Sequence, residues 1–167
     1  MQKITPFLWF DTKAEEAANF YVSVFSARGK NSKVGSVTRY NEAGAKASGM
    51  PKGSAMTVSF QLEGQDFTAI NGGPHFRFNE AVSFVVHCES QEEVDHYWGK
   101  LCEGGDEKAQ QCGWLKDKYG LSWQIVPGVL IKLLQDKDPE KSKRVMQAML
   151  QMKKIDIRGL QKAYDQK

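Results

Sequence analysis

The chain has 167 residues, of which 41% are hydrophobic and 26% charged, and its formal net charge is +3. The length fits one domain or two small fused modules with a core, and the composition is ordinary for a soluble globular protein. No apolar run approaches the roughly 20 residues that span a bilayer, so we expect no membrane partner.

Three cysteines and the start of the chain bear on its compartment. The cysteines are odd in number and lack the CxxC spacing of metal or redox sites. No apolar secretion segment follows the first residues. We therefore expect a cytoplasmic, reduced protein.

Basic charge is concentrated at the end of the chain. From Gly128 onward, ten Lys or Arg residues stand against five Asp or Glu. Helices with interspersed charges usually present a solvated face, and the chain has no nucleic-acid-binding motif. We expect no nucleic-acid partner, although an interaction module acting through this basic tail stays open.

The first half of the chain alternates strands with one clear helix. Residues 4–10 are almost wholly apolar and predict a strand covered on both faces. Asp11 or Thr12 is expected to cap the helix that follows. Its apolar stripe is Ala14, Ala17, Ala18, Tyr21, Val24 and Phe25. The rest is predicted as a loop over 26–33, a strand over 34–40, a mobile loop over 41–53, and a hairpin of strands 55–62 and 67–71.

The second half centres on a hairpin. A strand over 81–88 and a helix over 91–102 capped by Ser90 precede it. Residues 111–127 predict two short strands joined by a turn over 117–120. One face of this hairpin carries Cys112, Trp114 and Gln124. A thiol, an indole and an amide on one surface suggest the lining of a pocket, although an edge hairpin with one half-buried polar residue stays open.

The two halves share one order of elements. Residues 14–21 align without gaps on residues 91–98, with paired Glu after a cap and an aromatic pair at the same place. Each helix follows an apolar strand and precedes a glycine-turned hairpin. The sequence therefore predicts an α+β domain over 1–127 built from tandem βαβββ modules over 1–73 and 80–127, the second shortened. Residues 128–167 are predicted as a helical C-terminal extension, with N-caps at Asp138 and Asp156.

This order and several motifs resemble the PhnB-like family of the glyoxalase, bleomycin-resistance and vicinal oxygen chelate superfamily. Many members of that family carry the label 3-demethylubiquinone-9 3-methyltransferase. The motifs are Pro-Phe-Leu-Trp-Phe-Asp from residue 6, Asn-Gly-Gly-Pro from 71, Phe-Asn-Glu-Ala-Val-Ser-Phe from 78, Gln-Cys-Gly-Trp from 111, Ser-Trp-Gln-Ile-Val-Pro from 122, and the tail over 145–156.

The resemblance implies eight strands in two curved half-sheets that enclose a cavity. Metal enzymes of the superfamily take ligands from the first, fourth, fifth and last strands. These positions correspond here to Ile4, Phe67 or Thr68, Ser83 and Gln124. Three of the four cannot serve as good ligands and Gln124 is a weak one, so we expect neither a metal nor a cofactor.

We therefore expect a homodimer that binds a small, partly apolar molecule in a metal-free cavity. The ligand-binding candidates are Asn71, Ser83, Cys112, Trp114 and Gln124. The two amides and the hydroxyl could bond a ligand or only one another, and Trp114 could stack on it. Cys112 has no base nearby in sequence to activate it as a nucleophile. The alternatives are a divalent-metal lyase or dioxygenase, or a methyltransferase as the family label says.

Overall fold

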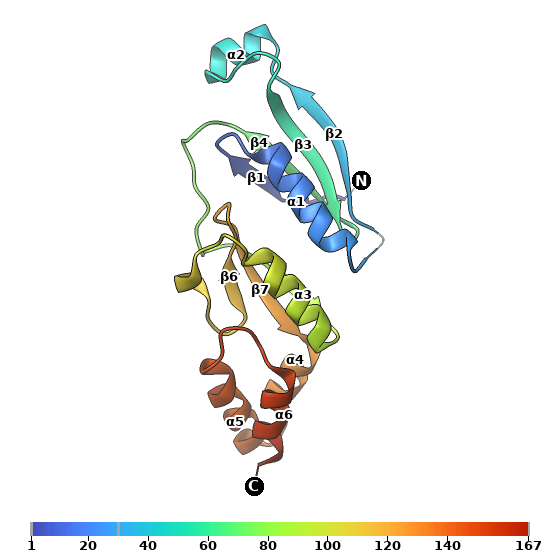
Figure 1. Cartoon of the computed structure of the whole chain (residues 1–167), viewed down its shortest axis with the longest axis vertical. Helices are drawn as coiled ribbons and strands as arrows, with labels where there is room; N and C mark the ends of the chain where they lie inside the picture. The colour runs from blue at the N-terminus through green and yellow to red at the C-terminus, as the bar shows by residue number, and fades with distance from the viewer. Residues whose placement is uncertain (1, 30, 167) are drawn as a thin grey trace. The chain divides into compact units, whose positions relative to one another are not determined.

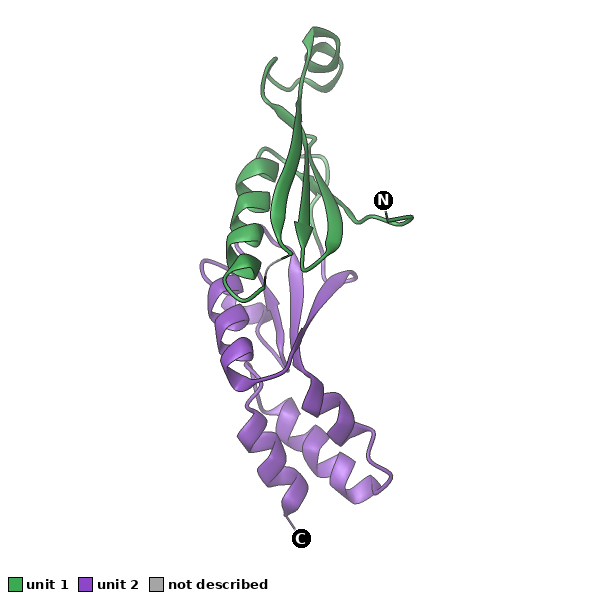
Figure 2. Cartoon of the chain, turned by 90° about the vertical axis from the view of Figure 1, so that its right-hand side faces the viewer, with its two compact units in different colours: residues 1–78 green, residues 79–167 purple. Residues whose placement is uncertain are grey.

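The chain folds into two compact units, residues 1–78 and 79–167 (Figure 2). The structure is a computed structural model that describes residues 2–29 and 31–166. Each unit places a helix, α1 or α3, on one face of a small mixed sheet (Figure 1). The fold is therefore α+β, as predicted.

Unit 1 holds a four-stranded sheet of order β1-β4-β3-β2, in which β1 runs parallel to β4 and the other pairs are antiparallel. Its strands are β1 (Phe7–Phe10), β2 (Lys33–Arg39), β3 (Ala55–Leu62) and β4 (Gln65–Asn71), and its helices are α1 (Ala14–Ser26) and α2 (Glu42–Ser48).

Helix α1 packs the predicted stripe into the core of unit 1, since all six of its apolar residues are buried. The predicted N-caps are wrong. The N-cap residue is Lys13, and it makes no side-chain capping bond. Instead Asn71 Oδ1 at the end of β4 accepts a 2.7 Å hydrogen bond from the backbone N–H of Ala14. A residue remote in sequence thus satisfies one of the donors exposed at the helix start.

The mobile loop expected over 41–53 contains a short helix, α2. Asn41 caps it by accepting a 2.8 Å hydrogen bond from Gly44 N. Gly49 ends it in the left-handed conformation, at φ 75°. None of its residues is buried, so it has no apolar stripe from which a helix could be predicted.

Unit 2 repeats the arrangement with one strand fewer. Its sheet has the order β5-β7-β6, with β5 parallel to β7 and β6 antiparallel to it. The elements are β5 (Ser83–Cys88), α3 (Gln91–Leu101), the 3-10 helix η1 (Glu107–Ala109), β6 (Trp114–Lys116) and β7 (Ser122–Pro127). Ser90 caps α3 as predicted, accepting from Glu93 N. Residues 2–29 and 31–166 form seven strands rather than the eight expected, because η1 and a turn stand where unit 1 has β2.

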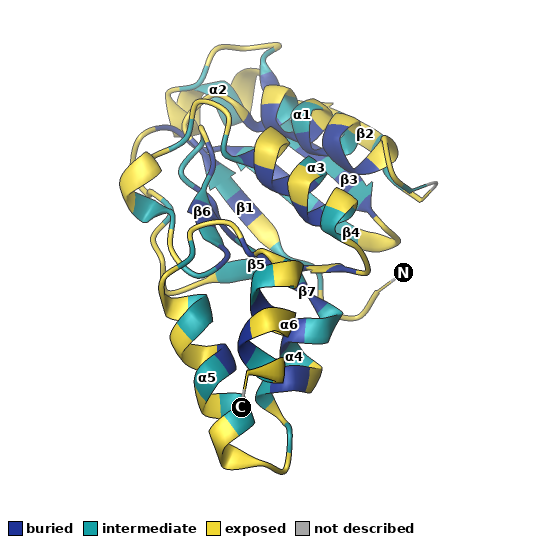
Figure 3. Cartoon of the chain, turned by 60° about the horizontal axis from the view of Figure 1, so that its bottom comes forward, coloured by how far each residue is buried: buried dark blue, intermediate teal, exposed yellow. Residues whose placement is uncertain are grey.

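The C-terminal extension forms α4 (Gly128–Leu134), α5 (Pro139–Leu150) and α6 (Ile157–Asp165). Both predicted N-caps are confirmed, because the side chains of Asp138 and Asp156 accept bonds from the first turns of α5 and α6. Five buried residues of the extension form one cluster (burial is coloured in Figure 3): Leu130, Leu133, Val145, Ile155 and Leu160. No helix within the described ranges has the length and apolarity to span a membrane.

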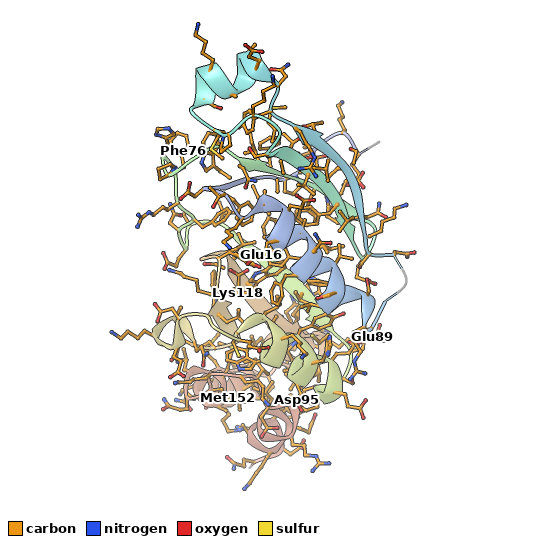
Figure 4. All side chains as sticks on the ribbon, turned by 45° about the horizontal axis from the view of Figure 1, so that its top comes forward. Glu16, Phe76, Glu89, Asp95, Lys118 and Met152 are labelled. Carbon is orange, nitrogen blue, oxygen red and sulfur yellow. The ribbon has the colours of Figure 1, made fainter. Side chains whose placement is uncertain are left out.

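Backbone hydrogen bonds attach the extension to the rest of unit 2. Cys112 N donates to Met152 O and Gly113 N donates to Lys153 O, both at 2.8 Å. The side chain of Gln91 on α3 bonds the carbonyl of Ile155 and the amide of Ile157. An ion pair at 2.6 Å joins Lys154 to Asp95 on α3. Figure 4 labels Asp95 of this ion pair and Met152, whose carbonyl accepts from Cys112.

Candidate functional site

The candidate site lies on the face of the unit 2 sheet opposite to α3. Side chains alternate between the two faces of a strand. Val86, Cys88 and Ile125 are buried on the α3 side. Six of the alternate positions form what we call the open face: Ser83, Val85, Trp114, Lys116, Ser122 and Gln124. His87 and Val126 continue this side of the sheet toward the ends of β5 and β7.

Strand register orders these six residues into two rows. Ser122 is the Cα partner of both Ser83 and Lys116, and Gln124 is the partner of both Val85 and Trp114. The hairpin prediction is confirmed in this respect, because Trp114 and Gln124 lie side by side on one face.

Gln124 and Ser83 are joined directly, since Gln124 Nε2 donates a 2.9 Å hydrogen bond to Ser83 Oγ. Neither Gln124 Oε1 nor the indole N–H of Trp114 has a hydrogen-bond partner among residues 2–29 and 31–166. Beside them Val85 is 44% exposed. The open face therefore offers one acceptor and one donor next to apolar surface.

Lys116 brings a positive charge to the open face. Its side chain is 22% exposed, and its Nζ forms an ion pair with the carboxylate of Glu80, which is 62% exposed. The hydrogen bond from Lys116 is the main cause that lowers the pKa of Glu80 below its ordinary value. The sequence offered no signal for this pair, because the two residues are 36 positions apart.

A buried carboxylate fixes the turn between β6 and β7. Asp117, 2% exposed, accepts hydrogen bonds from the backbone amides of Tyr119 and Leu121 at 2.8 and 3.0 Å. Its Oδ2 accepts another, at 2.8 Å, from the indole N–H of Trp123. The predicted turn over 117–120 is thus confirmed, and it positions Lys116 at the end of β6.

Cys112 does not lie on the strand face where it was predicted. It stands in a tight turn from Gln111 to Trp114, with φ 52° at Cys112 and φ 86° at Gly113. Two consecutive positive φ angles are typical of a type I′ turn, so β6 starts only at Trp114. The Cys112 thiol accepts a hydrogen bond from Gln111 Nε2 at 3.3 Å, which places an amide and not a base beside it.

Asn71 belongs to unit 1, where backbone groups occupy its amide. It is 4% exposed, and besides the bond from Ala14 its Nδ2 donates to Ala55 O at 3.1 Å. Asn71 thus ties the start of α1 to the start of β3. These bonds give Asn71 a structural role. Of the predicted site residues, Ser83, Trp114 and Gln124 are the ones that lie together on the open face.

Comparison with known proteins identifies the family. The family model described as 3-demethylubiquinone-9 3-methyltransferase matches residues 2–126. The chain belongs to this PhnB-like family. A PhnB protein of the same description from Bacillus cereus is 39% identical, with a TM-score of 0.63, over 76% of this chain and 100% of that one.

More distant structures share the fold alone. Protein PA1353 from Pseudomonas aeruginosa is 18% identical with a TM-score of 0.56, over 76% of this chain and 98% of its own. The fosfomycin resistance protein FosX from Listeria monocytogenes is 14% identical with a TM-score of 0.53, over 81% of this chain and 98% of its own. The fold is therefore the glyoxalase-like, vicinal oxygen chelate fold. Among curated proteins, none matches the chain significantly.

The residues at the superfamily's metal positions do not fit a divalent metal. Ile4 is 84% exposed and apolar, while Phe67 is buried and stacks on Phe60, which leaves Thr68 on the opposite face of β4. Ser83 and Gln124 bond each other. Within residues 2–29 and 31–166, no three His, Cys, Asp or Glu side chains gather as metal ligands would.

Proposed function

We propose that this PhnB-like protein binds a small, partly apolar molecule on the open face of unit 2. The observation that carries the proposal is the pairing of half-buried Trp114 with Gln124. Ligand sites combine apolar and aromatic surface with a few placed polar groups. The indole offers a stacking surface and an N–H donor, and Gln124 Oε1 offers an acceptor.

Binding is the function that these side chains suit best. Gln, Ser and Trp do not change protonation near neutral pH, so they orient and recognise a molecule but do not supply an acid or base. The methyltransferase and metal-enzyme alternatives have no additional support from the open face. The proposal requires neither a metal nor a cofactor.

A neutral fluorescent probe tests this proposal. Phenylnaphthylamine (NPN) is apolar and aromatic, and its emission rises when it leaves water. We expect NPN to bind the wild-type protein and quench its tryptophan emission, and Trp114→Ala to lose both effects. Trp98→Phe on α3 is the control, because Trp98 is buried away from the open face and its variant should behave as the wild type. Unchanged NPN binding by Trp114→Ala would refute the proposed site.

We also propose that the protein is a cytoplasmic homodimer. Within the described part of the chain, β5 stands at the edge of its sheet and pairs with β7, and Val82 just before it is 65% exposed. Apolar side chains at a sheet edge favour association. The three free cysteines suit a reducing compartment. Light scattering after size exclusion should give twice the chain mass, and a monomer mass at micromolar concentration would contradict the dimer.

A further inference from the structure

We propose that the ligand of the open face carries an anionic group, a carboxylate or another oxyanion, which Lys116 binds in place of Glu80. The inference rests on the proposed function, because it concerns the same face. It adds the chemical class of the ligand, an apolar or aromatic body bearing one negative charge.

The position of Lys116 suits this role. It lies two residues after Trp114 on the same face of β6, so the two Cα atoms are about 7 Å apart. The long side chain is mostly buried and its Nζ reaches as far as Glu80. A molecule stacked on Trp114 therefore has its edge within reach of the ammonium group.

Glu80 is a replaceable partner for this cation. Its side chain is 62% exposed, whereas that of Lys116 is 22% exposed. Returning an exposed carboxylate to water costs little, whereas the ammonium group of a mostly buried lysine side chain gains from a counter-charge. A ligand oxyanion that displaces Glu80 leaves Lys116 paired, whereas a neutral ligand gains nothing from the cation.

The neighbouring carboxylate of Asp117 is engaged by other donors. Both oxygens of Asp117 accept hydrogen bonds from the turn and from Trp123. On the other side, Ser83 Oγ accepts from Gln124 Nε2 and can donate its own O–H to the same oxyanion. The charge complementarity of the open face thus favours an anion.

Two probes with a common skeleton test the inference. Anilinonaphthalene sulfonate (ANS) carries one negative charge and NPN carries none. We expect the wild type to bind ANS more tightly than NPN, and Lys116→Met to lower the ratio of ANS to NPN affinity about tenfold, as for a charge-assisted hydrogen bond. Glu80→Gln should raise ANS affinity several-fold at low salt, because it removes the competing carboxylate.

Lys118→Met is the matched control. It removes the same charge at a position two residues from Lys116, where the lysine side chain is exposed (Lys118 is labelled in Figure 4). It should leave the ratio unchanged. Two results would overturn the anion site: an equal fall of the affinity ratio in both lysine variants, or a ratio that Lys116→Met does not alter. If Trp114→Ala still abolishes NPN binding, the proposed function stands in either case. Failure of both probes to bind the wild type overturns the proposed function itself.

Discussion

The side-chain amide of Asn71 joins two elements of unit 1 in a region closed to water. It accepts from Ala14 N at the start of α1 and donates to Ala55 O at the start of β3. Each buried polar group left without a partner costs about 1–3 kcal/mol. Asn71 therefore stabilises the fold of unit 1 through these two bonds.

Asn71→Ala should lower the free energy of unfolding by about 2–4 kcal/mol, because it leaves two buried backbone groups unpaired. Denaturant unfolding measures this change. Asn19→Ala is the control, because the Asn19 bond to Glu15 O lies on the exposed side of α1 and its loss should cost about 0.5 kcal/mol or less. Equal effects of the two variants would contradict the structural role of Asn71.

The thiol of Cys88 should be inert in the folded protein. Burial, with the nearby Glu93 carboxylate adding to it, raises the pKa of Cys88 to about 12. The thiolate is the reactive form, so a disulfide reagent at pH 8 should modify half-buried Cys112 well before Cys88. Mass mapping of the modified peptides measures the order, and early modification of Cys88 would contradict it.

The same shift predicts a loss of stability in alkali. In the unfolded chain the thiol releases its proton near its ordinary pKa of 9.0, but in the folded chain the pKa is about 12. Between these values the folded state binds more protons, so stability falls as pH rises, by up to about 1.4 kcal/mol per pH unit. Unfolding curves of Cys88→Ala should show a shallower alkaline decline than those of the wild type. Parallel declines would exclude Cys88 as the cause.

At the scale of elements, Gly113 controls how the extension meets β6 and β7. Its φ is +86°, and a Cβ atom there would lie 2.9 Å from Ile125 O and 3.2 Å from Ile155 Cγ1. Gly120 has nearly the same backbone, at φ +87°, but nothing lies within 4 Å of its Cβ position. The two glycines separate backbone strain from crowding.

Gly120→Ala should cost about 1 kcal/mol of unfolding free energy, which is the penalty for a left-handed backbone alone. Gly113→Ala should cost about 2–4 kcal/mol, because the methyl group also pushes Ile155 and the extension away. Hydrogen exchange at the amides of Cys112 and Gly113, which bond the extension, should accelerate only in Gly113→Ala. Equal destabilisation by both variants would show that crowding against Ile125 O and Ile155 is unimportant.

Elements with local signals were predictable from sequence and the others were not. The stripe of α1 and the caps at Ser90, Asp138 and Asp156 are encoded within one or two helical turns. Helix α2 buries nothing, so no stripe indicates it. The N-terminus of α1 is capped from Asn71, 57 residues away, and no local rule anticipates that bond.

The candidate site divides in the same way. Strand alternation within one hairpin predicted that Trp114 and Gln124 share a face, and the register confirms it. The predicted position of Cys112 was wrong, because the residue lies in the left-handed turn before β6 and so does not follow the alternation of side chains along the strand. The Lys116–Glu80 pair depends on how the segment before β5 folds back, which composition and periodicity do not encode.

At the scale of the molecule, the extension is an addition with a core of its own. The family model ends at residue 126, just before α4, and the relative from Bacillus cereus is covered completely by 76% of this chain. All five residues of the buried cluster lie in the extension. Its attachment to the sheet and α3 combines hydrogen bonds and one ion pair with packing of the cluster against Val126.

A chain shortened to residues 1–127 should therefore still fold, because its own core stays complete, but with less stability. Losing these hydrogen bonds should lower the free energy of unfolding by about 2–5 kcal/mol, at roughly 0.5–1.5 kcal/mol for each net bond. NPN binding should persist, since no residue of the open face lies in the extension. Circular dichroism, denaturant unfolding and NPN titration measure these outcomes. A shortened chain that is unfolded, or folded without binding NPN, would show instead that the extension completes the core or the site.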